Sequence, residues 1–295
     1  MNGLKILEGH TIDSLVDPKA LIDNIREALL GGRAVERVSM EESGSWLGLM
    51  GASSPGFFAV KIVGVYPENP ARGLPLVRGL LLLLSASSGE VLLAADAGPA
   101  TGWRTAAATA LALSLMGYSG GGVLGVIGAG VQARYHLEVL SRIYRPSRII
   151  ITSRTRARAE ALASEYGAEL ASLEDLLSAS QVVVSATNSR EPVVRGSLLR
   201  SGVLVASVGA PKPVRELDGT VIERSRCVLV DTRSGAERET DDVKGAREVV
   251  ELREMLEGRR CEWGDIKVYK SVGYSPLDLA IALHLYSRAA KDDPR

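Results

Sequence analysis

Residues 128–133 are Gly-Ala-Gly-Val-Gln-Ala. The small residues Gly128, Gly130 and Ala133 within this segment have the spacing of a phosphate-binding turn. Gly128 would permit a tight strand-to-helix turn, Gly130 would let the backbone approach a pyrophosphate, and Ala133 would let a helix pack closely. The free N–H groups at the start of that helix favour phosphate groups. The alternative is a structural turn in some other strand–helix–strand unit. The residues expected to line the cofactor turn are Gly128, Ala129, Gly130, Val131 and Gln132.

The end of the next expected strand, 148–152, indicates which dinucleotide is bound. Enzymes that use NAD place Asp or Glu about 20 residues after the turn, where it binds the ribose 2′-hydroxyl. This chain has Ser153, Arg154 and Thr155 there instead. No carboxylate would repel a 2′-phosphate, and hydroxyl and guanidinium groups would bind one. We therefore predict NADP(H) in preference to NAD(H); the alternative is that these are solvated charges before the next helix.

Lys61 interrupts residues 57–65, a stretch that is otherwise apolar on both faces. A strand of that composition is usually covered on both faces. Burial would lower the pKa of the lysine toward the range of a general acid or base. The alternative is an edge-strand lysine whose ammonium group reaches water. The sequence does not decide between the two.

Arg104 is expected to begin a helix over residues 104–116. A cation at a helix N-terminus opposes the helix dipole, which disfavours a purely structural role. Arg104 is therefore a candidate clamp for a substrate carboxylate or a cofactor phosphate. A surface arginine is the alternative.

Two loops follow expected parallel strands, and ligands bind beyond the carboxyl ends of such strands. Thr187 follows the strand 181–186 and is expected near the nicotinamide or ribose. Glu216 and Asp218 follow the strand 203–208 and could reach a substrate, although Asp218 could equally be a helix N-cap. The three histidines have no metal-ligand spacing, so we predict no catalytic metal.

The order of the expected elements indicates two domains. The first hundred residues combine one helix, 18–31, with strands that form a mostly antiparallel sheet. A glycine-rich breaker at 117–122 follows, and from residue 123 strands and helices alternate, as in a doubly wound parallel sheet. The expected strands are 46–50, 57–65, 77–85, 91–95, 123–127, 148–152, 181–186, 203–208, 227–231 and 266–270, and the later helices are 131–143, 157–166, 173–179 and 275–290.

Composition narrows the class of protein. The chain has 295 residues, 46% of them hydrophobic, with no net formal charge. Nothing in that balance favours nucleic acid or an anionic membrane as a partner. With no bilayer-length apolar run and no signal-peptide pattern, a cytoplasmic protein is expected. Cys227 begins an apolar strand, and we expect it to be a small core residue rather than half of a bridge with Cys261.

With these residues placed, the chain resembles the ornithine cyclodeaminase/mu-crystallin family over nearly its whole length. The combination of Arg-Thr-Ala-Ala with Gly-Ala-Gly-Val-Gln is specific to that family among nucleotide-binding proteins. The segments that carry the resemblance are 60–63, 67–69, 73–75, Asp96, Thr101, 104–107, 125–132, 185–187, 216–218, 271–273 and 278–280.

The resemblance implies roles for residues at matching positions. Lys61 would be the active-site lysine, Arg104 and Arg37 would hold the substrate carboxylate, and Asp218 would lie beside the substrate amine or imine. Ala186, Thr187 and Gly273 would contact the cofactor. The implied fold is α/β, a Rossmann domain over 118–274 plus an α+β substrate domain over 1–117 and 275–295, which forms a homodimer through its sheet.

The family shares hydride transfer at the α-carbon of an amino acid or its imine. We expect an NAD(P)H-dependent enzyme acting on a small 2-imino acid, with reduction of 1-pyrroline-2-carboxylate to L-proline as the first choice. Ornithine cyclodeaminase and alanine dehydrogenase remain alternatives. Family cyclodeaminases resemble NAD enzymes with an acidic residue after the second strand, whereas this chain has Ser153 and Arg154. A non-catalytic protein that binds NADPH and a small ligand is the alternative from a different class.

Overall fold

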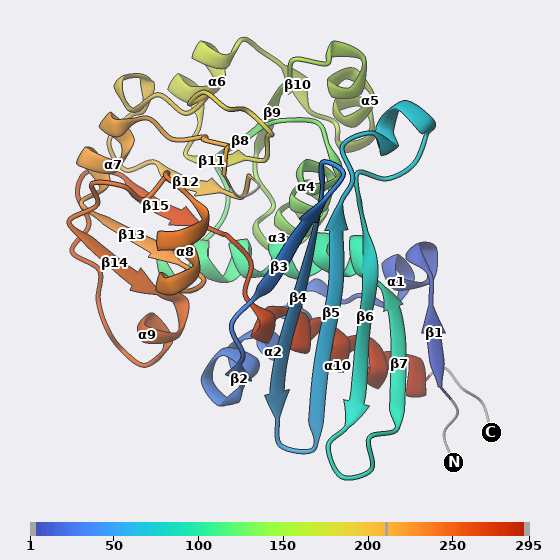
Figure 1. Ribbon diagram of the computed structural model, residues 1–295. Coiled ribbons are helices and arrows are strands. Elements are labelled where there is room, and N and C mark those ends of the chain that lie inside the picture. The colour runs from blue at the N-terminus through green and yellow to red at the C-terminus, as the bar shows by residue number, and fades with distance from the viewer. Residues whose placement is uncertain (1–3, 210–211, 292–295) are drawn as a thin grey trace. The chain divides into compact units, whose positions relative to one another are not determined.

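A computed structural model describes residues 4–209 and 212–291 and arranges them around two β-sheets (Figure 1). Within the described residues the chain divides into two compact units. Unit 1 comprises residues up to 104 together with those from 274 onward, and unit 2 comprises 105–273. Helix α3 (Ala97–Leu115) begins in unit 1 and ends in unit 2. The units therefore divide inside a helix rather than at the glycine-rich stretch after residue 117.

Unit 1 contains a seven-stranded sheet in the order β1-β7-β6-β5-β4-β2, with β3 paired to β4. All neighbours are antiparallel except β1 and β7. The elements are β1 (Lys5–Leu7), α1 (Gly9–Leu15), α2 (Pro18–Gly31), β2 (Arg33–Ala34), β3 (Val38–Glu42), β4 (Ser45–Ser54), β5 (Phe57–Val65), η1 (Asn69–Arg72), β6 (Val77–Ser85), β7 (Val91–Asp96) and α10 (Ser275–Lys291).

Helices α2 and α10 cover one face of this sheet (Figure 1). The sequence explains α2: Asp17 caps its first turn, Pro18 occupies the first helical position, and Leu21, Ile25 and Leu29 form one buried stripe. Helix α10 packs against α2 and against β4, β5 and β6. It returns from the end of the chain to complete the core of unit 1.

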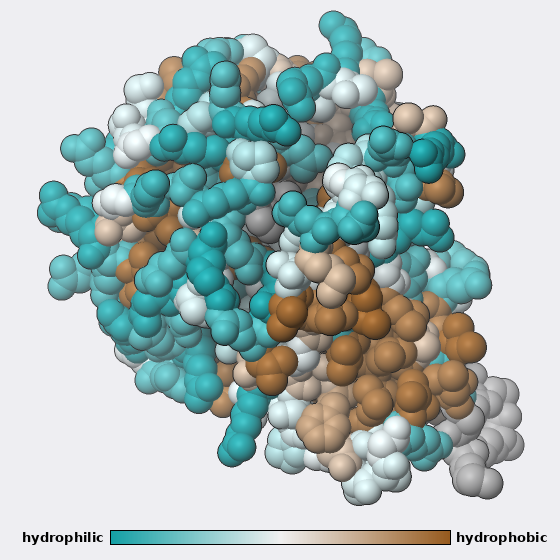
Figure 2. Space-filling model, in the orientation of Figure 1, coloured by the Kyte–Doolittle hydropathy of each residue, from teal (hydrophilic) through white to brown (hydrophobic). Residues whose placement is uncertain are grey.

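The opposite face of the unit 1 sheet is apolar and exposed (Figure 2). Along β5, Ala59, Lys61 and Val63 are buried, while Phe58 and Ile62 are exposed. The expectation that both faces of this strand are covered is therefore wrong for the chain alone. The exposed large side chains on this face include Val38, Met40, Phe58, Ile62 and Leu80. We call this surface the outer sheet face.

Unit 2 contains an eight-stranded parallel sheet in the order β10-β9-β8-β11-β12-β15-β13-β14. This is the doubly wound arrangement that the alternating pattern predicted. Its elements are β8 (Val123–Ile127), α4 (Val131–Tyr144), β9 (Arg148–Thr152), α5 (Arg156–Tyr166), β10 (Glu169–Leu170), α6 (Leu173–Ala179), β11 (Val182–Ser185), η2 (Gly196–Leu198), β12 (Leu204–Ser207), α7 (Gly219–Ser225), β13 (Cys227–Val230), α8 (Arg233–Glu239), β14 (Glu248–Glu251), α9 (Leu252–Leu256) and β15 (Lys267–Lys270).

The strands β8, β11, β12 and β13 of unit 2 are short and mostly aliphatic, and nearly all of their residues are buried, on both faces of the sheet. Val183, Val205, Val228 and Val268 share one core cluster with residues of the helices around them. None of the helices in the described part of the chain has the length and hydropathy needed to cross a bilayer.

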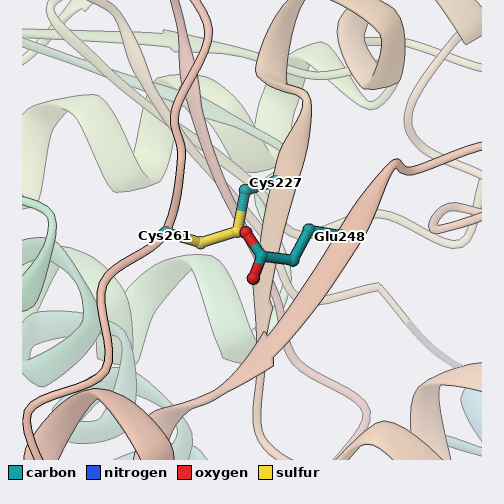
Figure 3. Close-up of side chains that lie close together, drawn as sticks. All are labelled: Cys227, Glu248 and Cys261. Carbon is teal, nitrogen blue, oxygen red and sulfur yellow. A yellow bond between two sulfur atoms is a disulfide. The ribbon is translucent and has the colours of Figure 1, made fainter.

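A disulfide joins Cys227, the first residue of β13, to Cys261, which lies between α9 and β15 (Figure 3). The expectation that Cys227 is not half of a bridge is therefore wrong. The position of Cys227 at the start of an apolar strand is typical of an ordinary core residue, and no local pattern indicates that residue 261, 34 positions later, packs beside it. Glu248 on β14 lies opposite Cys227. Because the two sulfur atoms are bonded to each other, they do not act with Glu248 as thiolate ligands of a metal in this state.

Candidate active site

Lys61 lies in the interior of the unit 1 sheet, on β5, between Met50 of β4 and Leu81 of β6. The edge-strand alternative is therefore wrong. Because side chains alternate along a strand, Lys61 shares the inner face with Ala59 and Val63 and is only 2% exposed. An amine placed among apolar side chains requires a partner of opposite charge.

The partner of Lys61 is Asp278, in the first turn of α10. Lys61 Nζ donates to Asp278 Oδ1 at 2.7 Å, and Arg104 Nε donates to the same oxygen at 3.0 Å. All three side chains are buried. Arg104 does not begin its helix, because α3 starts seven residues earlier at Ala97. The dipole argument for Arg104 is therefore wrong. The buried ion pair with Asp278 is what makes Arg104 a candidate functional residue.

Arg37 precedes β3, and its guanidinium lies 5.9 Å from the centroid of the Trp46 ring. It also acts on Lys61, because its positive charge contributes to lowering the pKa of that amine. The group Lys61, Arg104, Arg37 and Asp278, which we call the unit 1 cluster, thus contains three cationic side chains and one carboxylate.

The environment lowers the pKa of Lys61 from 10.5 to about 8. Burial is the largest cause, because desolvation penalises the charged amine, and the charges of Arg104 and Arg37 act in the same direction. The charge and the hydrogen bond of Asp278 oppose the shift. A lysine with this pKa is mostly protonated at neutral pH and can still release its proton readily, as an acid–base group requires.

The cofactor turn of unit 2 follows β8 at the point where the strand order reverses between β8 and β11. Gly128 has φ +112°, and a Cβ there would lie 2.4 Å from the carbonyl oxygen of Ala186. A Cβ on Gly130 would meet nothing within 4 Å. Gly130 is also the N-cap of α4 without a side-chain cap, and Ala133 is fully buried. The turn therefore has open space beside uncapped N–H groups, which fits a pyrophosphate.

Other atoms of the turn are also open to a ligand. The Gln132 Oε1 atom is buried and has no hydrogen-bond partner among the described residues. Val131 is exposed at the start of α4, and Ala129 is half-buried. This arrangement leaves one acceptor, Gln132 Oε1, and one small surface open to a ligand, and the role of these residues in binding a dinucleotide stays a prediction.

The end of β9 presents Ser153, Arg154 and Thr155. Arg154 and Thr155 are exposed, and Ser153 Oγ accepts from the Thr155 N–H at 3.3 Å. Arg156 pairs with Glu160 on the same helix, whereas Arg154 forms no such pair with any described residue. Arg154 is therefore the arginine here that is available to a ligand phosphate.

Glu216 is fully buried and accepts hydrogen bonds from the ends of β11 and β12 and from the loops that follow them. Its Oε1 accepts from Ser185 Oγ, Thr187 N and Thr187 Oγ1 at 2.7–2.9 Å, and its Oε2 accepts from Ser207 Oγ and Gly209 N at 2.7 and 2.8 Å. With every acceptor position in use, Glu216 holds the backbone beside the cofactor turn rather than reaching a substrate. Ala186 and Thr187 lie in the first of these loops.

Asp218 makes the hydrogen bonds of a helix cap. It is the N-cap of α7, accepting from Val221 N at 2.9 Å, and it also accepts from Gly196 N at 3.1 Å. This is the structural alternative that the sequence allowed. Its role beside a substrate nitrogen stays a prediction. Gly273 donates its N–H to Asp231 Oδ2 at 2.8 Å, and its φ of +85° suits glycine alone.

Sequence reasoning missed three buried charged residues: Asp231, Lys270 and Asp278. Lys270 Nζ donates to Ser207 Oγ at 3.0 Å and lies 3.0 Å from Asp242 Oδ2. Asp231 accepts from the segment 271–273. Asp231 directly follows the apolar strand β13, Lys270 ends β15, and Asp278 lies in the first turn of α10; the position of Asp231 after an apolar strand is the signal that could have identified it. Asp278 was noticed only as part of the resemblance.

Comparison with known proteins gives a consistent result. The ornithine cyclodeaminase/mu-crystallin family model matches residues 12–293. The ketimine reductase mu-crystallin of Mus musculus is 32% identical over 252 residues, which cover 82% of this chain and 80% of that protein. The Delta(1)-pyrroline-2-carboxylate/Delta(1)-piperideine-2-carboxylate reductase of Azospirillum brasilense is 31% identical over 296 residues, 95% of this chain and 94% of that protein. The structure of Thermococcus litoralis Delta(1)-pyrroline-2-carboxylate reductase in complex with NADH and L-proline has a TM-score of 0.89 and 26% identity, covering 97% of this chain and 98% of that one.

Proposed function

Because the chain belongs to the ornithine cyclodeaminase/mu-crystallin family, we propose that it reduces 1-pyrroline-2-carboxylate, a cyclic 2-imino acid, to L-proline. It is an NAD(P)-dependent oxidoreductase of the class that contains imino-acid reductases and amino-acid dehydrogenases. The choice of substrate is supported by the names of the Azospirillum brasilense and Thermococcus litoralis relatives.

The observation that carries the proposal is the charge of the unit 1 cluster. Within it, Lys61 and Arg104 are buried and share the single carboxylate of Asp278, so this pair of cations lacks one negative charge. Buried charges are stable only when paired, and a substrate carboxylate would supply the missing anion. Arg104 uses its Nε for Asp278, which leaves its two terminal nitrogens for a forked bond to that carboxylate. Arg37 would assist.

Lys61 would be the general acid of the reaction. Reduction of the imine adds a hydride to carbon and a proton to nitrogen, and a bound nicotinamide cofactor supplies the hydride. The Lys61 ammonium would donate the proton to the substrate nitrogen and recover it from water. Its pKa of about 8 keeps it charged at neutral pH, yet makes it a stronger acid than an ordinary lysine. Asp218 would share this task only if it left its cap positions.

The cofactor would be bound by residues of unit 2 that the structure leaves open to a ligand. The turn 128–132 would hold the pyrophosphate, and Ala186, Thr187 and Gly273 would lie beside the nicotinamide end. Ser153, Arg154 and Thr155 would bind a 2′-phosphate, so we propose NADPH in preference to NADH. The exposed Arg154 supports that preference.

The experiment that tests the proposal follows the oxidation of NADPH and of NADH with 1-pyrroline-2-carboxylate, beside pyruvate plus ammonia. NADPH-selective reduction of the cyclic imine is the expected result. Reduction of pyruvate plus ammonia alone would replace the proposal with an alanine dehydrogenase. If neither NADPH nor NADH is oxidised with either substrate, and ammonia is released from ornithine, the protein is a cyclodeaminase. Cofactor binding without any turnover would make it a binding protein.

Replacing Arg154 tests the cofactor preference. In Arg154→Ala we expect the KM for NADPH to rise by about tenfold or more, because a hydrogen bond to a charged group contributes about 1.5–3 kcal/mol. The KM for NADH should not change, since NADH lacks the 2′-phosphate. Arg156→Ala, which removes the neighbouring arginine that pairs with Glu160, is the control. Equal effects on both cofactors would contradict the assignment.

The outer sheet face supports the proposal of a homodimer. Phe58, Ile62 and Leu80 are exposed on adjacent strands, and Figure 2 shows a continuous apolar surface there. Surfaces of this kind mark interaction sites in folded proteins. We expect Ile62→Glu to shift the sedimentation of the protein from dimer to monomer. A parent protein that sediments as a monomer at micromolar concentration would contradict the dimer.

A further inference from the structure

Asp278 joins two cations that come from different elements of unit 1. Its Oδ1 accepts from Lys61 Nζ of β5 and from Arg104 Nε of α3, and its side chain is 3% exposed. Asp278 lies in the first turn of α10, the helix that packs across β4, β5 and β6. The carboxylate therefore fixes the distance between the amine and the guanidinium through one shared atom.

An aspartate at the N-cap of a helix accepts from free backbone N–H groups. Asp17 does so for α2, and Asp218 does so for α7. Asp278 is the fourth residue of α10 rather than its N-cap, and its second oxygen, Oδ2, is buried and has no hydrogen-bond partner among the described residues. The hydrogen bonds that this side chain forms are therefore to Lys61 and Arg104, not to its own helix.

This set of partners lowers the stability of the fold, because Oδ2 is left without a donor. The cost is explained if the carboxylate is needed by the two cations. A buried carboxylate oxygen without a donor destabilises the fold. Lys61 and Arg104 repel each other, as the effect of Arg104 on the pKa of Lys61 indicates. An anion between them keeps both charged and close together in a buried site.

We propose that Asp278 is a positioning residue, which holds the Lys61 amine protonated and turns the guanidinium of Arg104 toward the substrate carboxylate. This inference rests on the proposed function, in which Lys61 donates a proton and Arg104 binds the substrate. Asp278 itself would touch neither substrate nor cofactor. It would act through the two residues that it joins.

The first test is the pH profile of Asp278→Asn. In the parent protein we expect kcat/KM to fall above pH of about 8, where Lys61 loses its proton. Asp278 opposes the lowering of that pKa, so its neutral replacement should move this limb at least one pH unit toward acid. A merely structural role would lower kcat/KM by the same factor at every pH. An unmoved limb would overturn the proposal.

Asp17→Asn is the matched control, because it removes a charged helix-start residue of unit 1 that caps α2 and pairs with Arg288. It should lower the unfolding temperature without moving the pH limb. Should Asp278→Asn fail to fold, Asp278→Glu keeps the charge but displaces it by one methylene. We expect kcat/KM to fall at least tenfold in that variant, and parent-like kinetics would overturn the proposal.

A second readout needs no turnover and so separates this inference from the proposed function. The pKa of Lys61 in the folded protein, about 8, lies below its ordinary value of 10.5. The contribution of Lys61 to stability is thus present above pH 10.5 and is lost as the pH falls through about 8. In Asp278→Asn this loss should continue below pH 8, and the double variant with Lys61→Met should abolish it. Identical pH dependence in the parent and Asp278→Asn would overturn the inference even if no substrate were found.

Discussion

Lys61→Met is expected to lower kcat for imine reduction by at least about a hundredfold, the usual scale for the loss of a general acid–base group. Met has a similar length and is apolar, so the inner face of β5 should still pack against its neighbours on β4 and β6. The variant removes the proton donor while leaving Arg104 paired with Asp278. Substrate binding should therefore suffer less than turnover.

The same variant should not be less stable at neutral pH. Lys61 is buried in its charged form, and the fall of its pKa from 10.5 to about 8 corresponds to a cost of about 3 kcal/mol below pH 8. That cost sets in as the pH falls from 10.5 to about 8, and Lys61→Met removes it. Steady-state kinetics and thermal unfolding at pH 7 check both statements. The control is Lys19→Met on the exposed face of α2, which should change neither quantity. A kcat within tenfold of the parent would refute the assignment of Lys61.

Arg104→Met is expected to raise the KM for 1-pyrroline-2-carboxylate by about a hundredfold or more. Two charge-assisted hydrogen bonds to the substrate carboxylate would be lost, and each contributes about 1.5–3 kcal/mol. Arg104→Lys keeps the charge without the planar fork, so its KM should fall between those of the parent and of Arg104→Met. The defect should appear in the KM for the imino acid and not in that for the cofactor.

Measurement of both KM values, with cofactor affinity followed by quenching of protein fluorescence, checks the prediction for Arg104. Arg72→Met is a suitable control, because Arg72 forms an exposed pair with Glu68 in the same unit. A lower kcat with an unchanged KM would show that Arg104 acts on the transition state rather than on substrate binding. Loss of cofactor affinity would instead assign Arg104 to a cofactor phosphate.

Strong local periodicity explains which elements could be predicted. Strands β5, β6 and β8 and helix α2 have the bounds that the sequence predicted, because their apolar residues repeat at two or at three to four positions between clear turns. Helix α3 differs: Gly98, Pro99 and Gly102 disfavour a helix, so the sequence placed its start at Arg104. Burial of the first residues of α3 overrides that local preference.

The sites depend on contacts between distant parts of the chain, which local patterns do not contain. The nucleotide turn could be found because its residues are consecutive. Asp278 lies 217 positions from Lys61 and 174 from Arg104, so no spacing rule brings the three together. The bridge between Cys227 and Cys261 was missed for the same reason. The resemblance supplied roles, yet it did not indicate that Asp218 would be engaged as a helix cap.

Strand β5 also limits how this chain can change in evolution. Its inner side chains include Lys61, and its outer side chains, Phe58 and Ile62, form part of the outer sheet face. Since the two sets alternate, insertion or deletion of one residue within the strand would exchange them and move the amine to the opposite surface. Substitutions at Phe58 or Ile62 leave that alternation intact. The outer surface can therefore diversify by point mutation, whereas the length of β5 is fixed by the lysine that it carries.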